Sequence, residues 1–497
     1  MAKSIMIQGT MSNAGKSLLT TGLCRVFRQD GYSVAPFKSQ NMALNSFITR
    51  EGLEMSRAQA VQAEACGIEP SVLMNPILLK PVTEMGSQVI VKGEVLGTMD
   101  AREYYKIKPS LTPDILSAYE TLASMHDIIV LEGAGSPAEI NISAGDTVNM
   151  GMARMAKAPV LLVGDIDRGG VFAQLVGTVM LLEAWEQNLL KGLIINKFRG
   201  DLDILRPGLS MLDDRCGKPV LGVLPYLHVD IDDEDSLSER LSRTEAPGLL
   251  DIAVIRLPKI SNFTDFSALE ATPGISVRYV GSPSQLRNPD MIILPGTKNT
   301  IPDLLWLRQN GLEAAIKQRV SGGCILFGIC GGYQMLGQTV SDPLETQVGG
   351  SVAGMGLLPI STAFYAEKRS VRTGGTLLDI SGALCGLSGK SVEGYDIHMG
   401  KTTLENGAKP LLLLNSGDVG GCFSGNVYGC YLHGFFDSND CRRSVISALC
   451  AKRGIEENSI GAVDRQEHKE KQYDLLADAL RANLDMKRIY RILDEGI

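Results

Sequence analysis

The sequence predicts an α/β protein with two successive domains, and three observations support this fold class. The chain has 497 residues, enough for about two to four domains of ordinary size. Short, continuously apolar runs alternate with helical patterns, as expected for parallel strands that are buried on both faces and joined by helices. The alternation stops at an acidic, serine-rich stretch, residues 228–248, that ends in Pro-Gly, and it resumes afterwards.

These features predict the organisation of the whole chain. The first domain is expected over residues 1–228, with strands at 4–8, 33–37, 127–131, 159–163, 192–195 and 220–224. Residues 229–249 are expected to form a linker. The second α/β domain is expected over 250–445, with strands at 252–257, 277–280, 291–294, 324–327, 411–414 and 428–432. Leucines and isoleucines three and four residues apart predict a helical tail over 446–497.

Composition excludes several classes of protein. The net charge of −8 argues against nucleic acid as the main partner, because phosphate binding needs a basic surface. No apolar run reaches about 18 residues, so we expect no membrane-spanning helix. The N-terminus lacks the features of a signal peptide, and the ten cysteines form no C-x-x-C pair. This pattern is typical of the reducing cytoplasm.

The first strand leads into a glycine-containing loop, GTMSNAGKS, which spans residues 9–17 and precedes a helical pattern. A P-loop usually has four residues between its first glycine and Gly-Lys-Ser, whereas this loop has five. Its backbone N–H groups can still converge on phosphate oxygens at a helix N-terminus. A plain strand-to-helix turn is the less favoured alternative. The predicted nucleotide-binding residues of the loop are Gly9, Thr10, Asn13, Gly15, Lys16 and Ser17.

Acidic residues follow several of the later strands, where the ligands of an open parallel sheet collect. Because Mg²⁺ takes oxygen ligands, the predicted metal ligands are Ser17, Glu132 and Asp165. Each acid could instead cap a helix or lie on the surface. The candidates for contact with a substrate or an intermediate are Asp146, Asp167 and Arg168, although the arginine could equally form a structural salt bridge.

The segment INKFRGD, residues 195–201, follows a strand and places Asn196 where many P-loop proteins recognise the base. A guanine-binding motif of the Asn-Lys-x-Asp kind needs an acid that accepts from guanine N1 and N2. Here that position is Arg199. The sequence therefore predicts ATP as the nucleotide.

In the second domain, Cys330 lies in Gly-Ile-Cys-Gly-Gly between a predicted strand and a helix. This is the arrangement of a nucleophile elbow, with cysteine in place of serine. The start of the following helix stabilises a thiolate. The backbone N–H groups of Gly296 and Thr297, together with that of Gly331, are candidates for an oxyanion hole. The alternative is a buried structural cysteine.

Downstream, the segment YGCYLHGFF supplies His433, the predicted base for Cys330. Of the five histidines, His398 in EGYDIHMG is the other candidate for a role in the site. It could bind substrate, arrange the site or simply pack.

At this point both halves resemble known proteins. The second domain resembles class I glutamine amidotransferase domains, which have a flavodoxin-like fold. Residues 3–440 as a whole are similar to the cobyric acid synthase family of cobalamin biosynthesis. The stretches that carry this similarity occur in order along the chain: PFKSQNMALNS, RAQAVQAEACGIEP, MNPILLKP, LEGAGSPAEIN, GDIDRGGVFA, INKFRGD, RLPKISNFTDF, LPGTKNT, FGICGGYQMLG, EGYDIHMG and YLHG.

The resemblance implies an activity. Members of this family amidate the b, d, e and g carboxylates of adenosylcobyrinic acid a,c-diamide, using glutamine, ATP and Mg²⁺. Their P-loop half is similar to dethiobiotin synthetase. The implied roles are nucleophile for Cys330 and base for His433. The broader amidotransferases have a glutamate two residues after this histidine, but here the position is Phe435, so no third catalytic residue is indicated.

Two alternatives stay open at this point. One is the sister enzyme that makes the a,c-diamide, although QNMALNS and MNPILLKP favour the enzyme that forms four amides. The other is a P-loop switch protein of the partitioning type with an inactive amidotransferase-like domain. An intact Cys330 and His433 pair argues against the switch protein. Glutaminase activity discriminates between such a protein and an active amidotransferase. The sequence leaves the oligomeric state unknown.

Overall fold

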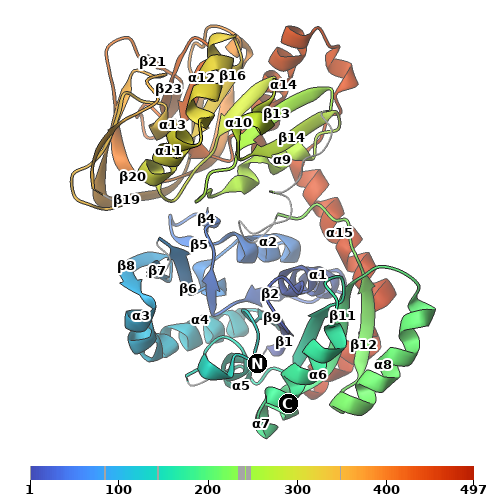
Figure 1. Ribbon diagram of the computed structural model, residues 1–497. Helices are drawn as coiled ribbons and strands as arrows, with labels where there is room; N and C mark the ends of the chain where they lie inside the picture. Colours follow the sequence, from blue (N-terminus) through green and yellow to red (C-terminus); the bar gives the residue numbers. More distant parts are fainter. Residues whose placement is uncertain (1, 83–85, 143–144, 233–240, 242–247, 348) are drawn as a thin grey trace. The chain divides into compact units, whose positions relative to one another are not determined.

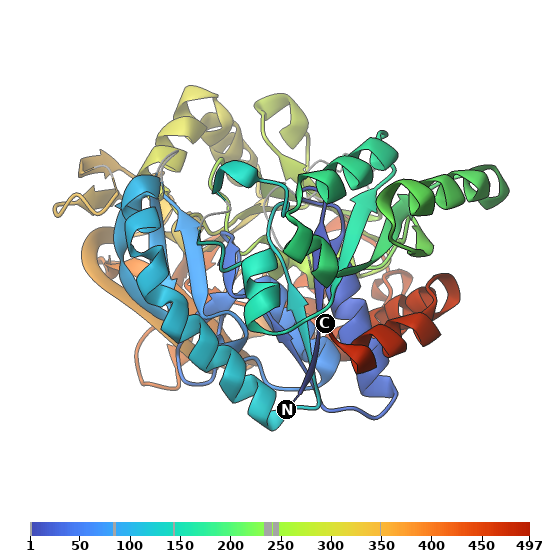
Figure 2. The same ribbon diagram turned by 90° about the horizontal axis from the view of Figure 1, so that it is seen from below.

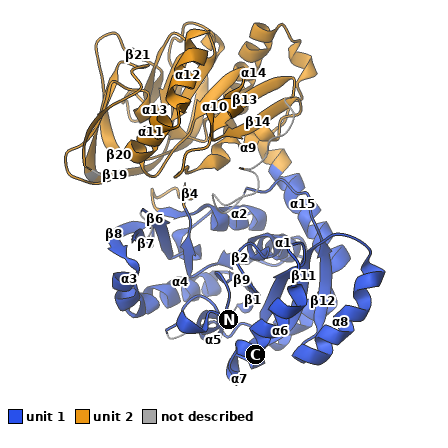
Figure 3. Ribbon diagram, viewed as in Figure 1, with its two compact units in different colours: residues 1–43, 54–232, 469–497 blue, residues 44–53, 233–468 orange. Residues whose placement is uncertain are grey.

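The computed structural model describes residues 2–82, 86–142, 145–232, 241, 248–347 and 349–497. The chain divides into two compact units (Figure 3). Unit 1 comprises residues 1–43, 54–232 and 469–497, and unit 2 comprises residues 44–53 and 233–468. The predicted domains were continuous, whereas each unit takes in a distant piece of chain. Most of the predicted linker, 229–249, lies outside the described residues.

Unit 1 is built on a six-stranded sheet in which all neighbours are parallel (Figure 1). The order is β12-β11-β10-β1-β9-β2, with bounds β1 Lys3–Gly9, β2 Val34–Phe37, β9 Ile128–Glu132, β10 Val160–Asp165, β11 Leu190–Phe198 and β12 Val220–Pro225. The six predicted strands are confirmed. Because β1 lies between β9 and β10, the loop after Gly9 begins beside the ends of both neighbours.

Helices join these strands, as the alternating pattern predicts. Their bounds are α1 Lys16–Gln29, α2 Arg57–Cys66, α3 Ala101–Ile107, α4 Thr112–Met125, α5 Met150–Met155, α6 Val171–Leu181, α7 Ala184–Leu189 and α8 Leu202–Cys216. Alternate residues of the strands, such as Ile5 and Ile7, pack into one buried cluster with the apolar face of α1. Alternate residues of a strand lie on one face of the sheet, and this face packs against the apolar side of an amphipathic helix.

A smaller sheet in unit 1 was not predicted. Its order is β3-β6-β7-β8, with bounds β3 Gln40–Met42, β6 Ile77–Pro81, β7 Gly86–Val91 and β8 Glu94–Asp100. β3 has only three residues, two of them polar, and β8 is mostly exposed. Neither strand therefore has the apolar pattern that marks a buried strand in the sequence.

The predicted tail, 446–497, is divided between the two units. Its first part continues α14 (Asn439–Arg453) in unit 2. From Lys469 onward, α15 (Arg465–Asn483) and α16 (Met486–Glu495) belong to unit 1, because their apolar residues complete the core against α1. The two ends of the chain meet there (Figure 2), where Lys3 Nζ donates to Asp494 Oδ1 at 2.6 Å.

Unit 2 contains a seven-stranded sheet in the order β14-β13-β15-β16-β24-β23-β21. The first five strands are parallel, and the sheet ends in two antiparallel strands. The bounds are β13 Leu250–Ile255, β14 Ile275–Val280, β15 Met291–Leu294, β16 Ile325–Ile329, β21 Lys409–Pro410, β23 Gly421–Ser424 and β24 Val427–Cys430. The helices of this unit are α9 Ser267–Glu270, α10 Pro283–Leu286, α11 Thr300–Gln309, α12 Leu312–Ser321, α13 Gly331–Met335 and α14.

A second sheet in unit 2 carries the predicted base. Its order is β18-β17-β19-β20-β25, with bounds β17 Thr339–Asp342, β18 Gly350–Ala353, β19 Ile360–Leu377, β20 Ser391–Leu404 and β25 Leu432–His433; β22 Leu412–Leu414 pairs with β19. The predicted strand 428–432 is thus two strands in two sheets. The long hairpin β19–β20 was not predicted, because its many charged residues interrupt any apolar run.

The remaining short strands are β4 Ser46–Ile48 and β5 Glu54–Ser56. None of the described helices combines the length and the hydrophobicity that a membrane span requires.

Candidate functional site

The glycine-containing loop has the geometry of a phosphate site. It joins β1 to α1, and its residues Asn13 and Gly15 have positive φ values of 60° and 102°. Gly15 is required, because a Cβ there would lie 2.0 Å from Asn196 Nδ2. Lys16 is buried, and its Nζ donates to the carbonyls of Met11 and Gly135 at 3.0 and 3.1 Å. A lysine whose ammonium group lies against these carbonyl oxygens can turn its charge to a phosphate.

Glu132 is the centre of a buried polar cluster beside this loop. Its Oε1 accepts from Ser17 Oγ and from Lys38 Nζ, both at 2.8 Å, and its Oε2 accepts from Gln62 Nε2 at 2.6 Å. The side chains of Glu132 and Lys38 are 0% and 3% exposed, so this ion pair is almost fully desolvated. The structure therefore brings two of the predicted metal ligands, Ser17 and Glu132, into direct contact.

Several buried polar atoms of unit 1 lack hydrogen-bond partners among the described residues. They are Gln8 Oε1, Thr20 Oγ1, Gln62 Oε1 and Thr147 Oγ1. An unsatisfied buried acceptor costs about 1–3 kcal/mol, so such a group indicates a ligand or solvent that completes the site.

Asp165, at the end of β10, is fully buried. Its Oδ2 accepts from Lys197 Nζ at 2.9 Å, and its Oδ1 accepts from the Asp167 amide at 2.9 Å. Asn196 is also buried, and its Nδ2 donates to the Ala14 carbonyl at 2.9 Å. Asn196 and Lys197, whose Nζ also donates to the Asn13 carbonyl at 2.8 Å, therefore support the phosphate loop.

The three tentative substrate residues have mainly local partners. Asp146 accepts from the amides of Val148, Asn149 and Gly151, between 2.8 and 3.2 Å, and so orders the turn before α5. Asp167 Oδ1 pairs with Arg199 Nε at 2.9 Å. The Arg168 side chain is 51% exposed, with its Nε 3.9 Å from Asp165 Oδ2.

Arg199, at the position where a guanine-binding motif has an acid, has two partners of its own. It pairs with Asp167, and its guanidinium lies over the Tyr226 ring at 3.6 Å from the centroid.

In unit 2, Cys330 lies in a strained turn between β16 and α13. Its backbone has φ 52° and ψ −112°, a conformation that costs energy for a residue other than glycine and is found at nucleophile elbows. The turn needs Gly332, since a Cβ there would lie 1.9 Å from the Leu294 carbonyl oxygen. The Cys330 side chain is buried, and Sγ donates to the Ile397 carbonyl at 3.4 Å.

His433 has a carboxylate partner that the sequence motifs did not reveal. Its Nδ1 lies 2.7 Å from Asp265 Oδ2, and Asp265 Oδ1 accepts from the Gly434 amide at 3.0 Å. Burial lowers the pKa of His433, but the charge and hydrogen bond of Asp265 and the contact with Cys330 outweigh burial and raise this pKa to about 10. Asp265, His433 and Cys330 thus form a buried acid–base–nucleophile series.

The predicted oxyanion residues lie beside this series. A Cβ on Gly296 would be 3.1 Å from His433 Cε1, and a Cβ on Gly331 would be 3.1 Å from the Thr297 amide nitrogen. The backbone bonds that hold this segment use the amides of Ser261 and Lys298. These two bonds do not involve the N–H groups that are predicted to form the oxyanion hole.

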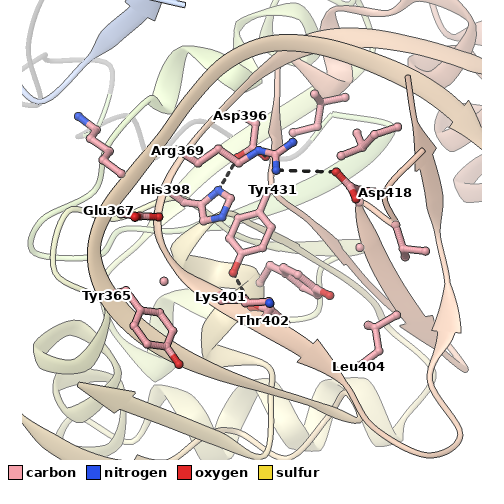
Figure 4. Close-up of a pocket in the computed structure, with 18 residues that line it drawn as sticks. Tyr365, Glu367, Arg369, Asp396, His398, Lys401, Thr402, Leu404, Asp418 and Tyr431 are labelled. Atoms are coloured by element: carbon pink, nitrogen blue, oxygen red, sulfur yellow. Dashed lines mark hydrogen bonds and ion pairs between the residues drawn. The ribbon is translucent and has the colours of Figure 1, made fainter. Parts of the chain in front are cut away.

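A cavity of about 620 Å³ is lined by residues of β19 and β20 and by Tyr431 and Leu432, which directly precede His433 in the chain (Figure 4). His398 lines it, stacks on Tyr431 with 3.6 Å between ring centroids, and bonds through Nδ1 to Asp396. Arg369 Nε pairs with the other oxygen of Asp396 at 3.1 Å. Ile397, whose carbonyl contacts Cys330, lies between two lining residues of β20. The cavity therefore combines both signs of charge close to the thiol.

Sequence reasoning missed three residues of these sites: Lys38, Gln62 and Asp265. Each lies within a stretch that carries the family resemblance, but none belongs to a recognisable short motif. The available signal was a charged or amide side chain just after or inside an otherwise apolar pattern, as in PFKSQ and NFTDF.

Both halves of the chain match known protein families. Residues 5–237 match the CobQ/CobB/MinD/ParA nucleotide binding domain, and residues 251–441 match the CobB/CobQ-like glutamine amidotransferase domain. The chain is 57% identical to a cobyric acid synthase of Lachnoclostridium phytofermentans, over 100% of both chains. It is 58% identical to that of Ruminiclostridium cellulolyticum, over 100% of this chain and 98% of the relative. For Dehalococcoides mccartyi the identity is 51%, over 100% of both chains.

Full-length identity at this level, with both domains matched, is far beyond what a shared P-loop or a shared elbow would give. The chain belongs to the cobyric acid synthase family, and it is a glutamine-hydrolysing carbon–nitrogen ligase of cobalamin biosynthesis.

Proposed function

We propose that this enzyme amidates the b, d, e and g carboxylates of adenosylcobyrinic acid a,c-diamide to give adenosylcobyric acid, with glutamine as nitrogen donor and ATP as activator. The observation that carries the proposal is the buried series Asp265, His433 and Cys330 on the same chain as a P-loop with Lys16 held over it. The series of Asp265, His433 and Cys330 suits the release of ammonia from glutamine, and the P-loop suits the activation of a carboxylate. Each amide consumes one glutamine and one ATP.

The glutaminase reaction begins at Cys330. Its thiolate attacks the side-chain amide carbon of glutamine, and the oxyanion of the tetrahedral intermediate is stabilised by backbone amides such as those of Gly296 and Gly331. His433 donates a proton to the leaving nitrogen, so ammonia departs and a glutamyl thioester forms. Water then attacks the thioester with His433 as base, which releases glutamate and restores the thiol.

The cavity beside the thiol fits the rest of the glutamine molecule. Its carboxylates, Asp396 and Glu367, are suited to an ammonium group, and Arg369 and Lys401 are suited to a carboxylate (Figure 4). In this proposal His398 arranges the cavity through its bond to Asp396 rather than acting on the thiol.

The synthetase reaction uses the P-loop of unit 1. An oxygen of the corrin carboxylate attacks the γ-phosphorus of ATP, the bond to the β-phosphate oxygen breaks, and an acyl phosphate and ADP form. Ammonia then attacks the acyl carbon, and phosphate leaves. Lys16 and Lys38, one over the loop and one paired with Glu132, are placed to offset charge on the transferring group.

The residues at the loop also fit Mg²⁺. Ser17 Oγ and Glu132 Oε1 are hard oxygen donors 2.8 Å apart, and the buried Gln62 Oε1 beside them has no partner among the described residues. No group of three or more His, Cys, Asp or Glu side chains in the described part of the chain is placed to hold a metal. Ser17 with Glu132 or Asp165 would hold the ion, together with oxygens of the bound nucleotide. When bound, it supplies positive charge to the β- and γ-phosphates.

We base the choice of ATP over GTP on Arg199, which occupies the sequence position where a guanine-binding motif has an acid. Its ion pair with Asp167 and its stacking on Tyr226 support a cation at that position.

Replacing Cys330 with alanine tests the division of labour between the two sites. We expect Cys330→Ala to abolish amidation with glutamine and to leave amidation with saturating ammonia within about twofold of the native rate, because the synthetase step needs only free ammonia. Cys385→Ala removes an exposed thiol of the same unit and is the matched control. Equal loss of both activities in a folded variant would contradict the proposal.

Replacing Asp265 with asparagine removes the charge that holds the proton on His433. We expect the glutaminase rate of Asp265→Asn to fall by roughly 10²–10⁴-fold, as for other catalytic carboxylates that orient a histidine. The exposed Asp379→Asn is the control.

The same variant has a pH signature. Because the folded-state pKa of His433, about 10, lies above its usual 6.5, the native pair adds stability that is fully present below pH 6.5 and is lost as pH rises through about 10. The difference in unfolding free energy between the native protein and Asp265→Asn should therefore shrink across this range. A difference independent of pH would remove the ion pair from the account.

Replacing Lys16 with alanine tests the phosphate site. We expect Lys16→Ala to lose amidation with glutamine and with ammonia alike, by roughly 10²-fold or more, since both routes share the phosphoryl transfer. Lys106→Ala, on the exposed face of α3, is the control and should keep native rates. Near-native turnover of Lys16→Ala with saturating ammonia would exclude this lysine from the mechanism.

A further inference from the structure

Residues 44–53 come from the synthetase half of the sequence, yet they are part of unit 2. They follow β3 and precede β5, and both of these strands belong to unit 1. The segment begins shortly after Lys38 and includes the end of the stretch PFKSQNMALNS. The reactions described above give this part of the stretch no role.

Three successive residues of the segment contact residues from the main part of unit 2, 233–468. The Ser46 amide donates to Asn262 Oδ1 at 3.1 Å. The Phe47 ring lies against the Tyr395 ring, with 6.4 Å between centroids. Ile48 is fully buried in a cluster with Tyr395 and Ile397. Beyond them the chain turns back, with the Thr49 amide donating to the Leu53 carbonyl at 2.9 Å.

The partners of the segment are the direct neighbours of the catalytic side chains. Asn262 Nδ2 lies 3.4 Å from His433 Nε2. The Tyr395 ring stacks on the imidazole of His433, with 5.1 Å between centroids and 15° between planes. The carbonyl of Ile397 accepts from Cys330 Sγ. Each residue that the segment contacts is thus itself in contact with His433 or Cys330.

The Ser46 contact fixes which end of the Asn262 amide faces His433. A backbone N–H can only donate, so Oδ1 must face Ser46 and the NH₂ group must face Nε2. A donor beside Nε2 favours the neutral ring with its lone pair there and opposes the imidazolium. Asn262 therefore acts against Asp265, which bonds the opposite ring nitrogen.

We infer that residues 44–53 are a positioning element of the glutaminase site: through Asn262 and Tyr395 they hold the His433 ring and weaken its hold on the proton. The inference rests on the glutaminase part of the proposed function. A base that must pass its proton to departing ammonia works best when its proton affinity is near the working pH. Asp265 alone would hold that proton too tightly.

The other titratable groups around His433 do not provide this balance. Asp265 and Cys330 both favour the imidazolium. Tyr395 presents its ring face, and the carboxylate of Asp396, next along β20, is engaged by His398 and Arg369. Among the described neighbours of the ring, the Asn262 amide is the group that opposes protonation.

The test measures the protonation of His433 directly. The protein has five histidines, so selective ¹³Cε1 labelling gives few signals, and loss of one signal in His433→Asn assigns it. In Phe47→Ala the segment loses its anchor on Tyr395. We expect the pKa of His433 to rise by about one unit, the glutaminase rate to fall about tenfold, and ammonia-dependent amidation to stay within about twofold.

Two variants separate this role from general destabilisation. Phe47→Tyr keeps the ring and should keep the native titration. Tyr279→Ala removes a buried aromatic side chain from the edge strand β14 of the same unit and should leave the His433 titration unchanged.

A double-variant cycle tests the path through the amide. Asn262→Ala should raise the pKa of His433 by itself, and adding Phe47→Ala should raise it no further, because the segment is inferred to act on this pKa through the Asn262 amide. An unchanged titration in folded Phe47→Ala, or additive shifts in the double variant, would overturn the inference. The titration needs no turnover, so absence of glutaminase activity in the native protein would count against the proposed function alone.

Discussion

The buried ion pair between Asp265 and His433 is the interaction on which the proposed chemistry of unit 2 depends. It joins residues 168 positions apart in the sequence, and the same carboxylate also accepts from the Gly434 amide, so it orients both the ring and the turn that follows it. Between β24 and His433 the chain leaves the large sheet and enters the second sheet at β25. Without the charge of Asp265, burial would drive the proton off the imidazole.

A buried carboxylate also organises the synthetase site. Glu132 holds a hydroxyl from the P-loop helix, an ammonium from the end of β2 and an amide from α2. Both sites are therefore preorganised around a desolvated acid whose partners come from separate elements, which favours fixed geometry over mobility. Membership of the cobyric acid synthase family gives the two sites one shared purpose, the transfer of nitrogen from glutamine to an activated carboxylate.

The sequence predicts the parts of this structure that depend on local patterns. The strands of the two parallel sheets are apolar runs, and Lys16 and Cys330 lie in turns whose glycines are visible in the sequence. The hairpin β19–β20 escaped prediction because its charged residues hide the alternation, although it lines the cavity. Asp265 escaped because nothing local ties NFTDF to a histidine 168 residues away. The recognition of the base by Asn196 stays a prediction, and in the structure its side chain donates to the Ala14 carbonyl of the phosphate loop.

The central claim is that Cys330 is acylated by glutamine in unit 2. It is tested most directly by mixing the protein with glutamine, quenching in acid within the first turnovers and measuring the mass of the peptide that contains Cys330. The account predicts a glutamyl adduct on this cysteine in the native protein. The steady-state amount of this adduct should be larger under conditions that slow hydrolysis of the thioester. A peptide that stays unmodified while glutamate and ammonia are released would contradict it.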